Sequence, residues 1–491
     1  MQSQKTSEPI RVLFLAAEAE PFIKVGGLGD VGGALPAALN RVSVENPDIA
    51  LDIRLVLPFH PTIQAEKHHI QWLFSFEVPT PKGSITAQAH TTTIDGLVVY
   101  FIASRHFNDE LAVYSMDTSL DAEKYIFFSL AAIELARKLD WRPDILHAND
   151  WHTAASIYYL SLHQPKDPFL QDTRSILTLH NLPFMGAGAE KAMKSFGLNA
   201  TDDTRLPVWA RHFPLALGLL HADAIVAVSP TYAEEILTPE FGCGLQDFLK
   251  TRQANITGIL NGQDMDAWNP AHDPYIAQTY SSADLSSRVA NKLALQAEFN
   301  LPAAPKVPLL ILVSRMDAQK GVDIAVESLR LLRKFKWQAI LLGSGDPVLE
   351  QECLKLQDEY PDQVRTALRF DSKLSHRMYA GGDILMMPSR YEPCGLSQMN
   401  AMRYGCIPVV RATGGLKDTV HELPGKDGGT GFACQKALPV DFAAAIKRAL
   451  DTYAHSSQWQ SLQLSAMAQD FSWNASALTY ARLYQSLRRM S

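Results

Sequence analysis

Short, continuous apolar runs alternate with longer helix-like stretches along almost the whole chain, and this alternation limits the fold more than any other feature. A run without polar alternation predicts a strand that is buried on both faces, and strands separated by helices predict parallel order. Each half of the chain is therefore predicted to be an α/β domain with a doubly wound parallel sheet. The runs lie at residues 11–16, 53–58, 97–102, 144–148, 175–180 and 224–229, and then at 309–314, 338–343, 364–370, 383–388 and 407–412.

A stretch rich in Gly, Asn, Asp and Pro separates the two halves, and 491 residues are too many for one ordinary core. We expect an N-terminal domain at 1–258, a linker at 259–270 and a second domain at 271–470. Residues 471–491 form an amphipathic pattern and are predicted to be a helix that packs back towards the first domain.

The formal charge of −7 gives no overall footprint for nucleic acid, although local basic groups can still bind a small anion. The five cysteines have no metal-binding spacing and are typical of reduced thiols in a cytoplasmic protein. No apolar run approaches the roughly 20 residues of a membrane span. The sequence thus predicts a cytoplasmic protein without a metal, a cofactor or a membrane partner.

The glycine-rich stretch "KVGGLGDVGG" at 24–33 contains the pattern G-x-G-x-x-G, which raises the hypothesis of a dinucleotide site. However, about ten residues, including Pro21 and Lys24, lie between the preceding strand and the pattern, whereas a dinucleotide fingerprint follows its strand directly. Backbone N–H groups and the dipole at the start of a helix also bind other anions. The stretch is better interpreted as a site for a different phosphorylated ligand.

In the second half, four strands are each followed by groups that suit a diphosphate. Arg315 and Lys320 follow one strand, Gly343 lies in a turn after the next, and Glu392 follows a third. A glycine pair, Gly414 and Gly415, begins a helix after the fourth. Because the carboxyl ends of parallel strands meet at one edge, these cations and N–H groups are predicted to stabilise a leaving diphosphate.

Nine stretches in order resemble the bacterial glycogen (starch) synthase family. They are "KVGGLGDV", "HANDWH", "LTLHNLPFMG", "AVSPTYAEEI", "LNGQD", "SRMDAQKG", "GSGDP", "SRYEPCGLSQ" and "RATGGLKDTV". The resemblance implies two Rossmann-like domains that face a central cleft (the GT-B type). It also implies transfer of glucose from ADP-glucose to the non-reducing end of an α-1,4-glucan, with retention of configuration and without a metal or cofactor.

The resemblance also implies roles for individual residues. Arg315 and Lys320 would bind the departing diphosphate, and Glu392 would contact the transferred glucose. His180 would lie near the glucose and Asp150 would meet sugar hydroxyls. The remaining predicted substrate-binding residues are Lys24, Gly26, Gly27, Asp30, Asn181, Asn261, Gly343, Phe370, Cys394, Gly395, Leu396, Ser397, Thr413, Gly414 and Gly415.

The chain departs from the pattern at several positions. Val25 replaces a usual threonine, Asn400 stands where many twin-domain retaining enzymes have a second glutamate, and Phe370 lacks a hydroxyl for the adenine. UDP-glucose as donor, a different small acceptor and a non-catalytic glucan-binding protein remain as alternatives. Locally, Asp150 and Glu392 could each cap a helix, and Lys24 could be an ordinary solvated lysine.

Overall fold

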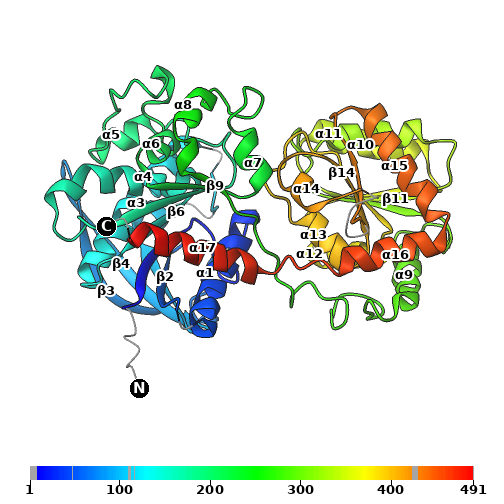
Figure 1. The fold of residues 1–491 in the computed structure, drawn as a ribbon, viewed down its shortest axis with the longest axis horizontal. Helices are drawn as coiled ribbons and strands as arrows, with labels where there is room; N and C mark the ends of the chain where they lie inside the picture. Colours follow the sequence, from blue (N-terminus) through cyan, green and yellow to red (C-terminus); the bar gives the residue numbers. More distant parts are fainter. Residues whose placement is uncertain (1–7, 47, 109–111, 116, 423–428, 490–491) are drawn as a thin grey trace. The chain divides into compact units, whose positions relative to one another are not determined.

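The computed structural model describes residues 8–46, 48–108, 112–115, 117–422 and 429–489. The chain divides into two compact units (Figure 1). Unit 1 consists of Met1–Val228, Ala233–Gly262 and Trp473–Ser491, and unit 2 of Ser229–Tyr232 and Gln263–Ser472. Each unit has its own sheet and helices, so the predicted class of two α/β domains is confirmed.

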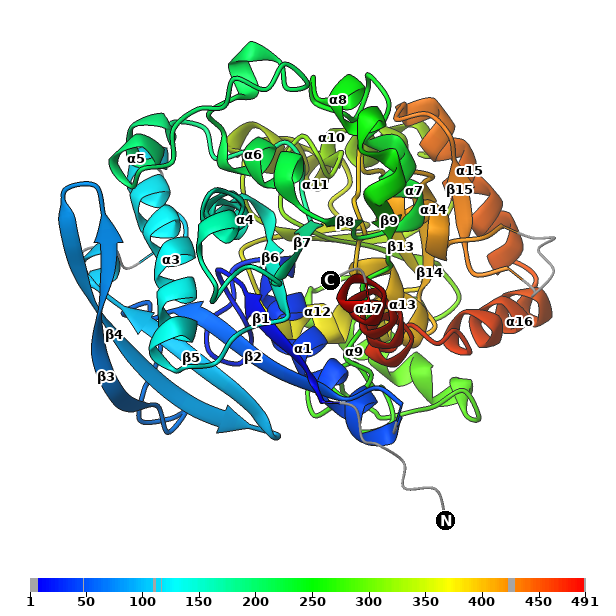
Figure 2. The same ribbon diagram turned by 60° about the vertical axis from the view of Figure 1, so that its left-hand side comes forward.

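Unit 1 is built on a nine-stranded sheet in the order β3-β4-β5-β2-β1-β6-β7-β8-β9. All the runs predicted as strands in this half are present, and they pair in parallel. Strands β3 and β4, visible at one edge in Figure 2, form an antiparallel hairpin that we did not predict. The strands are β1 (Ile10–Leu15), β2 (Leu51–Pro58), β3 (Gln71–Thr80), β4 (Gly83–Ile94), β5 (Leu97–Ala103), β6 (Ile145–Asn149), β7 (Arg174–Leu179), β8 (Ala224–Ala227) and β9 (Ile256–Gly258).

The helices of unit 1 cover its sheet, and the last one returns from the far end of the chain, as predicted. Helix α17 packs against α1 (Figures 1 and 2), and His147 Nδ1 on β6 lies 2.7 Å from the hydroxyl of Tyr484 on α17. The helices are α1 (Gly27–Glu45), α2 (Arg105–Asn108), α3 (Thr118–Lys138), α4 (Asp150–His163), α5 (Glu190–Ser195), α6 (Pro214–His221), α7 (Pro230–Glu235, shared with unit 2), α8 (Gln246–Thr251) and α17 (Trp473–Arg488).

Unit 2 has a six-stranded, fully parallel sheet in the order β12-β11-β10-β13-β14-β15. This is the doubly wound order 3-2-1-4-5-6 of dinucleotide-binding folds. The strands are β10 (Leu309–Val313), β11 (Gln338–Gly343), β12 (Val364–Leu368), β13 (Ile384–Met387), β14 (Ile407–Arg411) and β15 (Phe432–Cys434). The helices are α9 (Arg288–Glu298), α10 (Val322–Leu331), α11 (Pro347–Glu359), α12 (Ser372–Gly381), α13 (Ser397–Arg403), α14 (Gly414–Thr419), α15 (Pro439–Tyr453) and α16 (Ser456–Met467).

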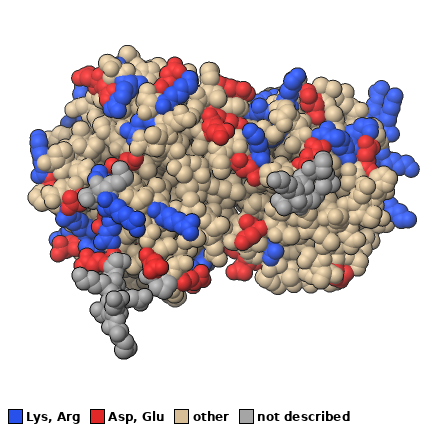
Figure 3. Space-filling model, viewed as in Figure 1, with Lys and Arg blue, Asp and Glu red and all other residues tan. Residues whose placement is uncertain are grey.

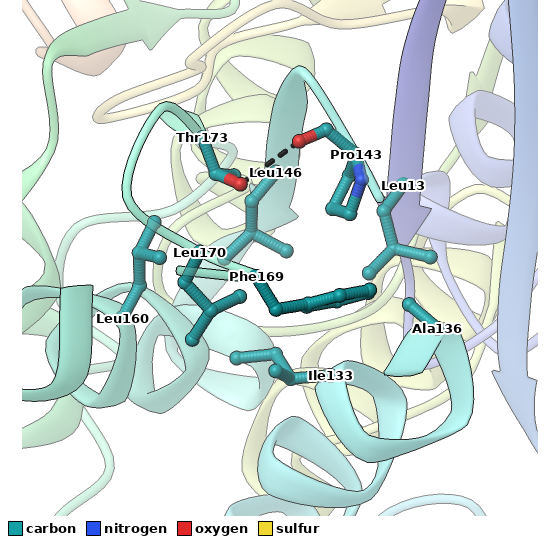
Figure 4. Close-up of a pocket in the computed structure, with 9 residues that line it drawn as sticks. All are labelled: Leu13, Ile133, Ala136, Pro143, Leu146, Leu160, Phe169, Leu170 and Thr173. Atoms are coloured by element: carbon teal, nitrogen blue, oxygen red, sulfur yellow. Dashed lines mark hydrogen bonds between the residues drawn. The ribbon is translucent and has the colours of Figure 1, made fainter. Parts of the chain in front are cut away.

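A small apolar cavity lies in the core of unit 1, between α3, α4 and the sheet (Figure 4). Its volume is about 10 Å³, and Leu146, Phe169 and Leu170 are among its lining residues. The hydroxyl of Thr173, a polar residue in the lining, donates a hydrogen bond to the carbonyl oxygen of Pro143 at 2.8 Å. The cavity is too small and too apolar for a polar substrate, so the functional site must be sought at the sheet edges.

The surface agrees with the weak overall charge. On the face drawn in Figure 3, Lys and Arg side chains are interspersed with Asp and Glu, and no stretch of one sign dominates. Among the described residues, no helix is both long and apolar enough to cross a membrane.

Candidate active site

Four of the predicted site residues lie at the topological switch points of the two sheets. In unit 1 this point lies between β1 and β6, and in unit 2 between β10 and β13. Ligands of open parallel sheets bind just beyond the carboxyl ends of the strands at such points. Lys24 follows β1 and Asp150 follows β6, while Lys320 follows β10 and Glu392 follows β13. We call the residues near Lys24 and Asp150 the amino-terminal half-site, and those near Lys320 and Glu392 the carboxyl-terminal half-site.

Lys24 is not an ordinary solvated lysine. Its Nζ lies 2.6 Å from Asp30 Oδ1, in the first turn of α1, and 2.9 Å from Glu20 Oε2. Burial alone would lower the pKa of Lys24, but the two carboxylates raise it above the ordinary 10.5. The lysine therefore carries a firmly held positive charge, and Asp30 contacts this predicted phosphate-binding group directly.

The glycine turn beside Lys24 is organised by a residue that sequence analysis did not select, Glu18. Its Oε2 accepts hydrogen bonds from the N–H groups of Val25 and Gly26, the latter at 3.1 Å. Only 1 % of Glu18 is exposed, and burial raises its pKa against the lowering effect of these hydrogen bonds. The N–H of Gly26, predicted to face the donor, is thus already used within unit 1.

Gly27 differs from its neighbours in this turn. A Cβ added at Gly27 would meet no atom within 4 Å, whereas one at Gly32 or Gly33 would collide with the backbone oxygens of Glu18 and Glu20. Gly32 and Gly33 therefore serve close packing of the segment after β1 onto α1. Gly27, at the first position of the helix, keeps an open face, and N–H groups there lack intrahelical acceptors. It remains the predicted backbone donor of this half-site.

Asp150 does not cap the helix that it begins. Its Oδ1 accepts from the N–H of His180 at 2.7 Å and from that of Asn181 at 3.3 Å, so it ties β6 to the end of β7. Its φ of 54° is a left-handed conformation, which is strained for a residue with a Cβ. Burial raises the pKa of Asp150 from 3.8 to about 7. A strained, buried carboxylate at a sheet edge is typical of a functional position.

His180 is neutral and fixed in orientation. Burial lowers its pKa to about 3, and its Nε2 lies 2.9 Å from Asn149 Oδ1. The Asn149 amide nitrogen donates to the carbonyl of Leu15 at 2.9 Å, so its oxygen is the acceptor and His180 Nε2 carries the proton. The ring therefore contributes no charge to the half-site.

Two predicted asparagines contain buried acceptor atoms without an internal partner. Asn181 Oδ1 and Asn261 Oδ1 have no hydrogen-bond partner within the described residues. They follow β7 and β9, on the same edge of the sheet as Asp150. Buried amide oxygens without partners are rare, and both atoms are suited to accept hydrogen bonds from ligand hydroxyls.

Lys320 and Glu392 form the centre of the carboxyl-terminal half-site. Lys320 Nζ lies 2.8 Å and 2.7 Å from the two carboxylate oxygens of Glu392, and the Ser389 hydroxyl donates to Oε2 at 3.1 Å. Glu392 is 4 % exposed. It is bound side-on by a cation, so it is not a helix cap, and α13 begins only at Ser397.

A second set of contacts, also absent from the predicted site, joins the two loops that carry this pair. Arg390 binds both oxygens of Asp323, at 2.9 Å and 2.7 Å, and donates to the carbonyl of Ala318 at 2.9 Å. The N–H of Arg390 donates to the carbonyl of Gln319 at 2.8 Å. Lys320 is therefore held in place by backbone and side-chain contacts of the loop that contains Glu392.

Arg315 and Phe370 are the exposed members of the predicted set. The side chain of Arg315 is 62 % exposed, with Nη1 3.2 Å from Asp317 Oδ2. Phe370, just after β12, is 85 % exposed. A ring this exposed presents its face for stacking, in line with the predicted contact to a base.

Three glycines of unit 2 that are predicted to bind the donor also lie close to neighbouring backbone. A Cβ at Gly343 would collide with the carbonyl of Ser314. The N–H of Gly415 donates to the carbonyl of Glu392 at 3.1 Å, and its predicted contact with a phosphate stays a prediction. A Cβ at Gly414, whose φ is 45°, would meet the carbonyl of Glu392. Gly414 and Gly415 let the start of α14 approach the Glu392 turn closely, and Gly343 lets the end of β11 approach Ser314.

The rest of that turn is compact. Cys394 is buried, Gly395 has a φ of 74°, and Leu396 precedes α13, which begins at Ser397. Thr413, also buried, is the residue before α14. Asn400, on α13, stands where many twin-domain retaining enzymes have a second glutamate. Its side-chain oxygen accepts a hydrogen bond from Gln263 Nε2 at 2.8 Å, within unit 2.

Each half-site thus pairs one lysine with one carboxylate at a switch point. Such a pair can bind a phosphate through the ammonium group and sugar hydroxyls through the carboxylate. Within the described residues, no group of three His, Cys, Asp or Glu side chains is placed to hold a metal ion.

Comparisons with known proteins match almost the whole chain. The family model described as "Starch synthase catalytic domain" matches residues 11–251, and the model "Glycosyl transferases group 1" matches 296–461. The chain is 39 % identical to the glycogen synthase of Anaeromyxobacter sp., over 97 % of this chain and 99 % of that protein. It is 38 % identical to the glycogen synthase of Clostridium perfringens, over 97 % and 98 %.

Among solved structures, the catalytic domain of starch synthase IV from Arabidopsis thaliana, bound to ADP and acarbose, matches with a TM-score of 0.88. It is 32 % identical, and the match covers 98 % of this chain and 99 % of that one. A sucrose-phosphate synthase from Thermosynechococcus elongatus, 19 % identical with a TM-score of 0.61, shares the fold alone.

Proposed function

The chain belongs to the glycogen and starch synthase family of glycosyltransferases, and from this premise we propose that ADP-glucose is its donor and that it retains the anomeric configuration. Glucose is then added to the free 4-hydroxyl at the non-reducing end of an α-1,4-glucan. The observation that carries the proposal is the pair of Lys320 and Glu392 at the switch point of unit 2. The ADP and acarbose of the starch synthase IV structure support the choice of donor and acceptor.

The chemistry follows from the charges. As the bond between the anomeric carbon and the β-phosphate oxygen breaks, negative charge develops on the diphosphate, and the cations Lys320 and Arg315 stabilise it. Glu392 is already ion-paired with Lys320, which makes it a poor nucleophile and a good acceptor for glucose hydroxyls. We therefore favour a same-face displacement in which the leaving phosphate oxygen takes the proton of the acceptor hydroxyl.

The amino-terminal half-site has groups of the same kinds, and we propose that they too bind phosphate and sugar groups. In this proposal Lys24, held by Asp30, and the first-turn N–H of Gly27 supply positive charge for phosphates, and Asp150, which is fixed by the N–H of His180, contacts a sugar hydroxyl. The partnerless oxygens of Asn181 and Asn261 are acceptors for further hydroxyls. Exclusion of water from the donor would prevent its hydrolysis.

The test is incubation of the purified chain with labelled ADP-glucose or UDP-glucose, with and without glycogen. The proposal expects label in the glucan from ADP-glucose, and a stereochemical analysis should find only α-linked product. Faster transfer from UDP-glucose would overturn the donor assignment, and label in a small product only would overturn the acceptor. The absence of transfer from either donor would favour a non-catalytic glucan-binding protein.

A further inference from the structure

We propose that Glu18, assisted by Tyr114, is a positioning residue that fixes the turn carrying Lys24 and so sets the affinity for the donor. This inference rests on the proposed function, because it assigns Lys24 to the donor phosphates. Neither residue belongs to the set predicted from the sequence.

The contacts of Glu18 divide between its two oxygens. Oε2 accepts from the backbone N–H groups of Val25 and Gly26, which directly follow Lys24. Oε1 accepts from the hydroxyl of Tyr114 at 2.9 Å. Three donors therefore converge on one buried carboxylate, and two of them belong to the turn that carries the lysine.

Tyr114 is itself held rigidly by α3. The carbonyl of Val113 accepts from Lys124 Nζ at 2.8 Å and from the hydroxyl of Tyr125 at 2.5 Å. The N–H of Ser115 donates to both oxygens of Asp121, at 3.1 Å and 2.9 Å. The residues on either side of Tyr114 are thus fixed to the helix, so its hydroxyl is presented to Glu18 without a large loss of conformational freedom.

A carboxylate is required at this position. Val25 and Gly26 precede the first turn of α1, where N–H groups lack intrahelical acceptors and the helix dipole favours negative charge. A carboxylate has acceptors on both oxygens, but a carboxamide has only one acceptor oxygen and two new donor hydrogens. A glutamine at position 18 would therefore lose either the contact to the turn or the contact to Tyr114.

Gly29 shows how closely the turn is fitted to Glu18. A Cβ added there would lie 2.9 Å from Cγ of Lys24 and 3.1 Å from Oε2 of Glu18. The lysine stem and the carboxylate are thus packed against the same small residue. A shift of the turn would move the Lys24 ammonium group by a similar distance.

The experiment compares Glu18→Gln with Glu134→Gln. Glu134 is also a mostly buried carboxylate of unit 1 that accepts from a tyrosine hydroxyl, that of Tyr159 at 3.4 Å, but it lies on α3 away from Lys24. We expect Glu18→Gln to lower kcat/KM for ADP-glucose about 100-fold, because small misplacements of a binding group are this costly. The KM for glycogen should stay within twofold, and Glu134→Gln should change neither constant.

Binding of ADP alone, measured by calorimetry, provides a readout that does not require turnover. The positioning role is supported if Glu18→Gln binds ADP more weakly than Glu134→Gln while the two variants have the same melting temperature. Equal ADP affinity in the two variants overturns it, and so does an equal rise of the KM for donor and glycogen. If Glu18→Gln does not fold, Tyr114→Phe serves instead, with an expected loss of about tenfold in ADP affinity.

Glu20→Gln separates geometry from charge. It removes a carboxylate beside Lys24 without touching the N–H groups of the turn. A loss as large as that of Glu18→Gln would show that the charge balance at Lys24 matters, and would overturn the inference. If the wild type transfers no glucose at all, the proposed function fails, while the ADP measurement still decides the role of Glu18.

Discussion

Each half-site contains a lysine whose ammonium group is matched by a carboxylate of the same unit. Lys24 is paired with Asp30, and Lys320 with Glu392. Lys320 contacts both oxygens of Glu392, whereas Lys24 contacts a second carboxylate, that of Glu20. Removing Lys320 leaves the buried Glu392 as an unpaired charge, which is costly.

Lys320→Ala should lower kcat by about 100- to 1,000-fold, the range for loss of one preorganised group that stabilises transition-state charge. Initial rates with ADP-glucose and glycogen measure this. Lys355→Ala is the matched control, since Lys355 is an exposed lysine of the same unit that is paired with Glu352. A kcat of Lys320→Ala within threefold of the control would remove Lys320 from the mechanism.

Asp150 makes a prediction about pH. Because burial raises its pKa from 3.8 to about 7, the folded chain holds this proton more tightly than the unfolded chain does. Its contribution to stability is therefore present at low pH and is lost as the pH rises from about 4 to about 7. Asp150→Asn keeps an acceptor for the N–H groups of His180 and Asn181 but has no proton to lose.

The free energy of unfolding of Asp150→Asn, minus that of the wild type, should therefore increase as the pH rises through this window. The increase should be on the order of 4 kcal/mol at most. Urea denaturation of both proteins at several pH values measures the difference. A difference that stays constant between pH 4 and 8 would contradict the raised pKa.

At the level of elements, the loops after β10 and β13 behave as one structure. Arg390 joins them through Asp323, in the first turn of α10, and through the carbonyl of Ala318. Gly321, with a φ of 66°, allows the first loop to pass close to the carbonyl of Pro388. The position of Lys320 relative to Glu392 thus depends on this contact between the loops.

Arg390→Ala should reduce kcat about tenfold or more, because it loosens a loop that carries a group of the half-site. Arg330 offers the control, since it makes an equivalent two-point contact to Glu359, at 2.8 Å and 2.7 Å, at the other end of α10. Arg330→Ala should cost stability but leave kcat within twofold. Equal kcat values for the two variants would show that Arg390 has only a structural role.

The strands differ in how readily the sequence predicts them. The central strands are continuous apolar runs because both of their faces are covered, and all those predicted are found. The hairpin of β3 and β4 lies at the edge of the sheet, and its burial alternates with exposure. The alternating pattern and the turn at Pro81–Lys82 could have identified it, but a search for continuous runs does not.

The site was predictable only where a residue acts near its own motif. Lys320 and Glu392 follow adjacent strands and were identified from the strand ends. The role of Glu18 depends on Tyr114, 96 residues away, so no local pattern contains it. Several glycines that are predicted to bind the ligand also adjoin backbone carbonyls, and a sequence does not distinguish close approach of a phosphate from close approach of a carbonyl.

At the level of the whole molecule, unit 1 is assembled from distant parts of the chain. Helix α17 contributes Tyr480, Tyr484 and Leu487 to the core that also contains α1 and β1. The hydroxyl of Tyr484 is hydrogen-bonded to Nδ1 of His147, and Nε2 of the same ring lies 2.7 Å from the hydroxyl of Thr178. The contact between α17 and the sheet therefore includes a buried polar network.

Tyr484→Phe should lower the free energy of unfolding by about 1–3 kcal/mol, because it leaves a nitrogen of the buried His147 without its partner. Thermal or urea unfolding followed by circular dichroism measures this. Tyr275→Phe, at an exposed tyrosine of unit 2, should change stability by less than about 0.5 kcal/mol. Loss of equal size in both variants would contradict the importance of the network.

The return of α17 also has a consequence for biosynthesis. A ribosome translates all of Gln263–Ser472 after Gly262 and before it reaches Trp473. At about 5–20 residues per second, the nascent first unit therefore waits on the order of ten seconds or more with the apolar surface beneath α17 uncovered. During that interval this apolar surface is open to aggregation or to binding by a chaperone.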